Sequence, residues 1–548
     1  MKINFTTLFL IVFSILYSCK PSVTQEAQNG INSNDDNIAP IKFSTSDLRD
    51  TTQTTAFKDQ FNLNLDKYLN IHFTLDEPLI TALRKIDEVA SDETLIQNGN
   101  FRFNFIVDGE EVYNHNLHPG AGWPKDKLNR KEYDITLLYP ESLDYWGWYL
   151  WLRFMKMGGG EDVLAEGVHT LKIEIQTYYT EDETKKGNVI ASGEVDVNVK
   201  EIPHDIEAVK VKPISKNSGW ALSESSFDKS KIETMNKKIA QNRFVAINGV
   251  VVIKDEKLLI EEYYNGENRE SLHDSRSVGK TIASTMMGIA IKEGYLNDEN
   301  LKLKEFYDLK NFENYDPLKE EVTLKSLLTM SSNILGNDDD YDSPGNEEKM
   351  YLTEDWVKFT LDLPIDKNKT MENDFDYLTA GIVVLGDVID KSVPGGLVNY
   401  TDEKFFKPLG ITKRNWQFTP QNVGNTAGGL QLRAVDFAKW GKVYKNKGQW
   451  KGQQLIPEKW VEKSLAHQVN QEGIENGTYG YLFWNNIYTV DGKEYAYSTC
   501  SGNGGNKIYI FKNLPLVIVI TASAYGMPFA HMQVDQMMER YILPAVID

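Results

Sequence analysis

The chain has 548 residues, of which 41% are hydrophobic and 25% charged, a composition typical of a soluble globular protein. Its length exceeds one ordinary domain and indicates two or three compact units. The formal net charge of −20 argues against a nucleic-acid partner, because phosphate recognition depends on lysine and arginine neutralising a polyanion.

Residues 1–19 have the features of a signal peptide. Lys2 precedes an apolar stretch that ends near residue 16 and is too short to span a bilayer. The stretch ends in Leu16-Tyr17-Ser18-Cys19, which resembles the lipobox of bacterial lipoproteins, although Tyr17 replaces the usual small residue. The resemblance implies acylation of Cys19. We expect a protein of the bacterial cell envelope that contacts the membrane through this lipid alone.

The next segment, 20–48, is polar and is expected to form a disordered tether. Residues 49–203 then show strand-like alternation, for example in Phe101–Val107, which meets the hairpin signal Asp108-Gly109. Thr170–Ile175 and Glu194–Val199 alternate in the same way. These patterns predict an N-terminal all-β sandwich domain.

Two features inside this region could carry a function. The aromatic run Tyr145–Trp151 could bind a sugar or a protein surface, but aromatic residues in strands more often belong to a sandwich core, which is the interpretation adopted. His115 and His118 could ligate a metal, yet no third ligand lies at a convincing spacing, so no metal is expected.

The second unit, 215–548, begins with the strand runs Gly249–Ile253 and Lys257–Ile260. A helix-rich stretch follows from about residue 277 to residue 464. Strands return at Lys507–Phe511 and Leu516–Ile520, before a final helical stretch near residues 531–542. This order predicts one sheet assembled from both ends of the domain, with a helical insertion between them.

The segment Ser277-Val278-Gly279-Lys280 opens an apolar helix. Residues three apart share a helix face, so Ser277 and Lys280 are expected to project side by side. A serine hydroxyl becomes nucleophilic when a neighbouring base takes its proton, and a partly buried lysine can be that base. A second Ser-x-x-Lys, Ser226–Lys229, is interpreted as an ordinary capped helix start.

Two further motifs lie downstream. Tyr377 precedes a very apolar helix and can share a proton with a lysine, since both side chains have unperturbed pKa values of about 10. The run Cys500-Ser501-Gly502-Asn503 directly precedes the strand that begins at Lys507. Its glycine lets a substrate lie along the strand edge, and the Asn503 N–H is expected to complete an oxyanion hole.

This order of motifs resembles class C β-lactamases and their relatives among esterases, D-aminopeptidases and 6-aminohexanoate-dimer hydrolases. The likeness covers residues 215–548 and includes neighbouring segments, namely Val322–Ser332, Pro408–Thr412, Ala427–Leu432 and Tyr479–Tyr481. It implies an α+β fold, with an antiparallel sheet flanked by helices plus a helical subdomain. It also implies a serine hydrolase that uses Ser277, Lys280 and Tyr377 without any cofactor.

Two departures from the family pattern bear on the substrate. Thr379 replaces the usual asparagine or serine after the tyrosine, and Cys500 replaces the cation that receives a β-lactam carboxylate. Loss of that charge-assisted contact, worth roughly 1.5–3 kcal/mol, favours neutral esters, amides or peptide-like substrates. Cys500, Ser501, Gly502 and Thr379 are candidate substrate contacts.

Two alternatives stay open. The first is a penicillin-binding DD-peptidase or β-lactamase, and the second is a non-catalytic surface binding protein on the same fold. The acidic run Asp338–Asp342 lacks the glycine and distal glutamate of a calcium loop and is interpreted as solvated surface.

Overall fold

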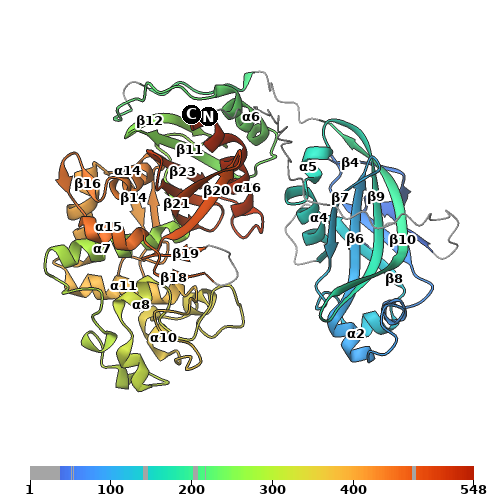
Figure 1. Ribbon diagram of the computed structural model, residues 1–548, viewed down its shortest axis with the longest axis horizontal. Coiled ribbons are helices and arrows are strands. Elements are labelled where there is room, and N and C mark those ends of the chain that lie inside the picture. The colour runs from blue at the N-terminus through green and yellow to red at the C-terminus, as the bar shows by residue number, and fades with distance from the viewer. Residues whose placement is uncertain are drawn as a thin grey trace, which may run out of the picture. The chain divides into compact units, whose positions relative to one another are not determined.

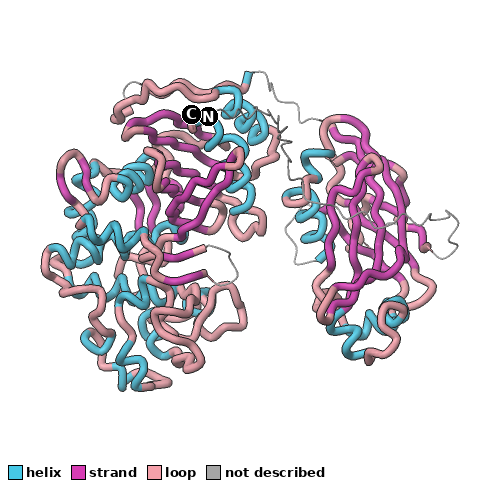
Figure 2. The backbone as a smooth tube through the Cα atoms, in the orientation of Figure 1, coloured by secondary structure: helices cyan, strands magenta, loops and turns pink. Residues whose placement is uncertain are grey.

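The computed structural model describes residues 38–50, 52, 55–63, 65–139, 146–200, 208–215, 218–471 and 477–547 (Figures 1 and 2). They divide into two compact units. The first comprises the described residues up to Phe61 together with Asp66–Trp148 and Thr170–Val197, and the second comprises the remaining described residues. The predicted signal peptide and Cys19 lie outside the described residues.

The N-terminal unit contains the expected sandwich of two sheets. One sheet has six strands: β1 (Ala39–Pro40), β10 (Thr184–Val199), β9 (Gly167–Thr180), β6 (Gly99–Val107) and β7 (Glu110–Asn116) in that order, with β4 (Gln60–Asn62) also on β10. The other has four: β3 (Phe57–Lys58), β2 (Lys42–Ser44), β5 (Leu69–Thr74) and β8 (Glu132–Leu138). The rings of Phe73 on β5 and Phe101 on β6 lie 6.2 Å apart, so side chains of the two sheets meet in a shared core. Asp108 and Gly109, both at positive φ, form the predicted hairpin turn between β6 and β7.

The predicted tether is shorter than expected. Residues 38–48 were assigned to it, yet β1 pairs with β10 and β2 pairs with β5. Ile41 and Phe43 are only 5% and 2% exposed. These apolar side chains contribute burial to the sandwich, which outweighs the polar composition of the residues before them.

The aromatic run is a helix rather than a strand, which corrects the sequence-based prediction. Helix α4 spans Trp146–Lys156, and its buried positions include Leu150, Trp151 and Phe154. That spacing of three and four residues is the period of a helix face. Four shorter helices accompany it: α1 (Leu79–Arg84), α2 (Asp92–Asn98), α3 (Pro124–Asn129) and α5 (Gly160–Val163).

The C-terminal unit is built on an antiparallel eight-stranded sheet. The strand order is β12 (Lys257–Tyr263), β11 (Ile247–Lys254), β23 (Leu516–Ala522), β22 (Asn506–Phe511), β21 (Lys493–Gly502), β20 (Trp484–Val490), β19 (Thr478–Tyr479) and β18 (Val469–Asn470). Strand β11 pairs with β23 although their sequences lie near opposite ends of the unit, as Figure 1 shows by their colours. The predicted assembly of one sheet from both ends is confirmed.

Both faces of this sheet are covered by helices. On β11, Val250 and Val252 pack with helices α6 (Lys229–Ala240), α16 (Ala530–Met537) and α17 (Leu543–Val546). The alternating residues Val251 and Ile253 pack in the opposite core with α7 (Thr281–Lys292), α11 (Thr379–Ser392) and α14 (Ala434–Lys445). Burial on both faces explains why these strands read as continuous apolar runs.

The helical insertion lies between β12 and β20. Its further helices are α8 (Leu324–Leu328), α9 (Glu347–Tyr351), α10 (Trp356–Asp362), α12 (Gly396–Thr401), α13 (Lys407–Leu409) and α15 (Glu458–Leu465). A small sheet of β13 (His273–Asp274), β15 (Leu430–Leu432) and β14 (Arg414–Trp416) and a hairpin of β16 (Gln449–Trp450) and β17 (Gln453–Gln454) accompany them. The α+β architecture with a helical subdomain is therefore confirmed. Within the described parts of the chain, no helix combines the length and the apolar character needed to cross a bilayer.

Candidate active site

The predicted nucleophile, Ser277, lies in a short 3-10 turn, Arg276–Lys280, that runs directly into α7. Pairing of β13 with β15 fixes the chain before this turn, and the Ser275 N–H donates to the Leu430 carbonyl at 2.9 Å. Arg276 has a φ of +45°, a left-handed conformation that a non-glycine residue holds only when its surroundings impose it. The backbone around Ser277 is therefore fixed by its neighbours.

The Lys280 amine is in direct contact with the Ser277 hydroxyl. Its Nζ donates to Ser277 Oγ at 2.7 Å and to the Ala427 carbonyl at 2.9 Å. Lys280 is only 2% exposed, so the amine cannot move away into solvent. This contact is the one that the spacing of Ser277 and Lys280 predicts, and it places the amine where a general base for the hydroxyl is needed.

Tyr377 is the third residue of the predicted active site. It lies just before α11, and its ring is close to the Lys280 amine. Lys280 Nζ lies 5.2 Å from the centroid of its ring, and the ring stacks on Trp484 with centroids 5.6 Å apart. Burial raises the pKa of the Tyr377 phenol, whereas the charge of Lys280 and hydrogen bonding with Ser277 act in the opposite direction. The phenol therefore keeps its proton at neutral pH and is suited to donate it.

The end of strand β21 passes beside the nucleophile. Its pairing with β20 stops at Thr499, so within the described residues Cys500–Gly502 have no strand partner on that side. A Cβ atom placed on Gly502 would lie 2.6 Å from the Ser275 carbonyl oxygen and 3.1 Å from the Ser277 nitrogen. Only a residue without a side chain allows the strand edge to approach the nucleophile this closely.

The residue after this strand offers a free amide. Among the backbone hydrogen bonds formed by the described residues, none uses the Asn503 N–H as donor. The Asn503 side chain is held instead, since its Oδ1 accepts from the Gly526 N–H at 3.0 Å. With the Ser277 N–H close to Gly502, two backbone donors are available for the oxyanion of a tetrahedral intermediate.

Substitution of Gly502 by alanine is expected to lower kcat/KM by about 100-fold. The added methyl group would push β21 away from the 3-10 turn, and a substrate bound along β21 would then be misplaced relative to Ser277. Ester hydrolysis by the purified variant checks this. Gly381→Ala is the matched control, since its Cβ would come no closer than 3.1 Å to the movable end of Leu327 and would meet Leu378 at an ordinary contact distance of 3.8 Å. Wild-type activity in Gly502→Ala would contradict the close approach.

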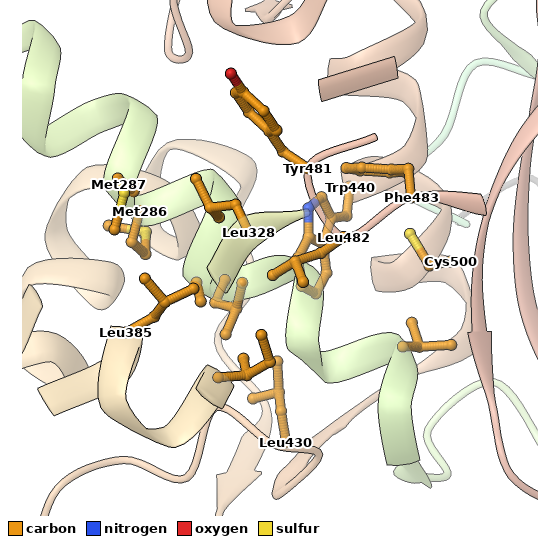
Figure 3. Packing of buried hydrophobic residues seen from close by; sticks show 14 of the residues in the cluster. Met286, Met287, Leu328, Leu385, Leu430, Trp440, Tyr481, Leu482, Phe483 and Cys500 are labelled. Carbon is orange, nitrogen blue, oxygen red and sulfur yellow. The ribbon is translucent and has the colours of Figure 1, made fainter. Parts of the chain in front are cut away.

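Two predicted substrate contacts on β21, Cys500 and Ser501, differ in their exposure. Cys500 is 2% exposed and lies in the apolar core that contains Met286, Leu385 and Trp440 (Figure 3), and burial raises the pKa of its thiol to about 12. Its side chain faces the core because side chains alternate along β21, which leaves the next residue, Ser501, half-exposed. The thiol stays protonated and buried, which contradicts the predicted contact of the Cys500 side chain with a substrate.

Thr379, the other departure from the family pattern, is fully buried in the first turn of α11. Its N–H donates to Asp338 Oδ2 at 2.7 Å, and among the described residues its hydroxyl has no hydrogen-bond partner. The side chain therefore does not face solvent, in contrast to the predicted substrate contact.

Asp338 is the residue that the sequence analysis missed. It was assigned to a solvated acidic surface, and its neighbours Asp339 and Asp340 are indeed exposed. Asp338 turns inward and bonds the backbone on both sides of Leu378. No sequence signal distinguishes it from the adjacent aspartates, because its partners Tyr377 and Thr379 lie about 40 residues further along the chain.

Comparison with known proteins identifies the family of this chain. The sequence profile of the family described as Beta-lactamase matches residues 240–538, more than half of the chain. The α+β fold is that of β-lactamase-like proteins, and the predicted residues Ser277, Lys280 and Tyr377 lie together within the matched region. The chain belongs to the β-lactamase family.

Solved structures resemble this chain at low sequence identity. A protein assigned as a 6-aminohexanoate-dimer hydrolase from Bacillus anthracis is 19% identical, with a TM-score of 0.44 over 55% of this chain and 79% of that chain. A protein assigned as a β-lactamase from Bacteroides dorei is 18% identical, with a TM-score of 0.46 over 57% and 99%. EstCE1, a hydrolase with promiscuous acyltransferase activity, is 11% identical, with a TM-score of 0.46 over 57% and 98%. No curated protein matches this chain.

Proposed function

We propose that this protein hydrolyses an ester or amide bond of a small-molecule or peptide-like substrate through an acyl-enzyme on Ser277. The observation that carries the proposal is the 2.7 Å hydrogen bond between Lys280 Nζ and Ser277 Oγ, formed beside the Tyr377 phenol. Membership of the β-lactamase family supports a serine hydrolase activity.

Acylation begins when the unprotonated Lys280 amine accepts the Ser277 proton and Oγ attacks the substrate carbonyl carbon. The carbonyl oxygen becomes an oxyanion held by the N–H groups of Ser277 and Asn503. Collapse of this intermediate breaks the bond to the leaving group, which takes a proton from the Tyr377 phenol. The proton on Lys280 then returns to Tyr377, so all charges balance.

Deacylation reverses the roles of these groups. A water molecule attacks the acyl carbon while its proton passes to Lys280 and Tyr377, and the same two N–H groups hold the second oxyanion. Ser277 leaves with its proton restored, and the acid product is released. No other group is required for either half of the reaction.

The burial of Cys500 favours esters and amides over β-lactams. The corresponding cation of β-lactamases binds the substrate carboxylate, and a buried neutral thiol cannot replace that charge-assisted contact. A β-lactam or a D-Ala-D-Ala terminus therefore loses a contact at this position, although family membership alone is compatible with both substrate classes.

A fluorophosphonate probe tests the proposal directly. We expect a covalent adduct that mass spectrometry assigns to Ser277, together with hydrolysis of p-nitrophenyl esters, D-amino-acid amides or amino-acid dimers. Nitrocefin turnover as fast as ester turnover would favour a β-lactamase instead. If the protein shows no labelling and no turnover, the result would favour a non-catalytic binding protein.

The proposed location is the bacterial cell envelope, with a lipid on Cys19. It rests on the lipobox-like segment Leu16-Tyr17-Ser18-Cys19 alone. A lipid anchor at this position would hold the enzyme at the membrane surface while its active site acts on soluble substrates.

A further inference from the structure

Asp338 holds the segment that carries Tyr377. Its N–H donates to the Tyr377 carbonyl at 2.9 Å, and its Oδ2 accepts from the Thr379 N–H at 2.7 Å. Its other carboxyl oxygen, Oδ1, accepts from the Glu347 N–H at 2.8 Å. One aspartate therefore bonds the backbone before and after Leu378 and ties both points to α9.

This contact replaces a missing helix cap. Leu378 is the N-cap residue of α11 and has no side-chain capping hydrogen bond. The first N–H groups of a helix lack partners within the helix, and a carboxylate there is also favoured by the helix dipole. Asp338 supplies that carboxylate from about 40 residues earlier in the chain, so its position and that of Tyr377 are coupled.

We infer that Asp338 is a positioning residue of the active site, which fixes the Tyr377 phenol against Ser277 and Lys280 through the backbone of residues 377–379. The inference rests on the proposed function, because Tyr377 is the group through which it acts. An aspartate is required because two N–H donors point at its two oxygens. An asparagine offers one acceptor, and its amide group would face the second donor.

Charge adds a second effect that packing alone would not produce. The titratable groups that face Tyr377 are Lys280 on the nucleophile turn, Asp338, Glu347 on α9 and the uncharged phenol of Tyr479 on β19. The two carboxylates raise the pKa of the phenol, whereas Lys280 lowers it. Burial in turn raises the pKa of Asp338, while its bond with Thr379 opposes that change. Neutralising Asp338 is therefore expected to lower the pKa of Tyr377.

The test compares Asp338→Asn with Asp339→Asn, which changes the same side chain at the adjacent exposed position. We expect Asp338→Asn to lower kcat for a p-nitrophenyl ester and the rate of fluorophosphonate labelling by roughly 10- to 100-fold, with KM changed less than twofold. The alkaline limb of the pH profile should move to lower pH. Asp339→Asn should match the wild type in all three measurements.

A double-mutant cycle with Tyr377→Phe separates positioning from a general loss of structure. If Asp338 acts through Tyr377, Asp338→Asn slows labelling in the wild type but has little further effect in Tyr377→Phe. Equal effects in both backgrounds, or a wild-type rate and pH profile in Asp338→Asn, would overturn the inference. A wild-type protein that neither labels nor turns over would instead overturn the proposed function.

Folding is monitored by circular dichroism and thermal melting. Should Asp338→Asn fail to fold, Asp338→Glu takes its place, because it keeps the charge and both oxygens but moves them by one methylene. The same coupling to Tyr377 is expected, without the shift in the pH profile. Loss of activity with no coupling to Tyr377 would again overturn the inference.

Discussion

Ser277→Ala is expected to lower the turnover of every ester or amide substrate by at least about 10,000-fold and to abolish fluorophosphonate labelling. The Ser277 hydroxyl oxygen is the atom that forms the covalent bond, and among the described residues it is the only hydroxyl that accepts a hydrogen bond from Lys280 Nζ. Cys500 is buried and protonated, and the only other Ser-x-x-Lys in the sequence, Ser226–Lys229, lies at the exposed start of α6. Substrate hydrolysis and intact-protein mass spectrometry measure the two effects.

Ser226→Ala is the matched control for this substitution, because it removes the same hydroxyl from the same sequence motif. It should label and turn over at the wild-type rate. Both variants should melt within a few degrees of the wild type, since a serine-to-alanine change at a half-exposed or exposed position removes little packing. Retained labelling in Ser277→Ala would show that another residue is the nucleophile.

The parts of the site that the sequence predicts best are those determined by local geometry. Ser277 and Lys280 are three residues apart on one helical turn, so their contact follows from the period of the helix. Strands such as β11 and β23 are long apolar runs near the two ends of the unit, and their pairing follows from their order in the chain. Tyr377 was found by its place in an ordered set of motifs rather than by any local pattern.

The parts that were missed depend on distant partners. Strands β1 and β2 are two and three residues long, and only their pairing with β10 and β5 makes them strands. Asp338 is one of three successive aspartates, and its inward direction is set by the N–H groups of Glu347 and Thr379. Composition cannot reveal such tertiary contacts, because Asp339, the same residue type one position later, is exposed.

The aromatic run is a different case, since its sequence did contain the signal. Leu150, Trp151 and Phe154 recur at intervals of one and three residues, which is a helix face and not the alternation of a strand. The interpretation as strand followed from the neighbouring strands and from the preference of aromatic residues for sheets. Periodicity was the better guide here because burial on one face, rather than propensity, determines the element.

Lys280→Met is expected to lower kcat/KM by roughly 100- to 10,000-fold, the range that a positioned general base contributes. Methionine fills the space of the buried stem but cannot accept the Ser277 proton. The change leaves the Ala427 carbonyl without its donor, a loss of about 1–3 kcal/mol, which a folded protein of this size should tolerate. Ester hydrolysis and thermal melting measure both consequences.

Lys229→Met is the control, since it removes an exposed lysine from the second Ser-x-x-Lys and should leave activity unchanged. A further comparison separates the base from the nucleophile. Lys280→Met keeps the hydroxyl, so its residual labelling should rise with pH as hydroxide takes over the removal of the proton, whereas Ser277→Ala should not label at any pH. If Lys280→Met turned over at the wild-type rate, the proton of Ser277 would have to leave by another route, and the 2.7 Å contact would be structural rather than catalytic.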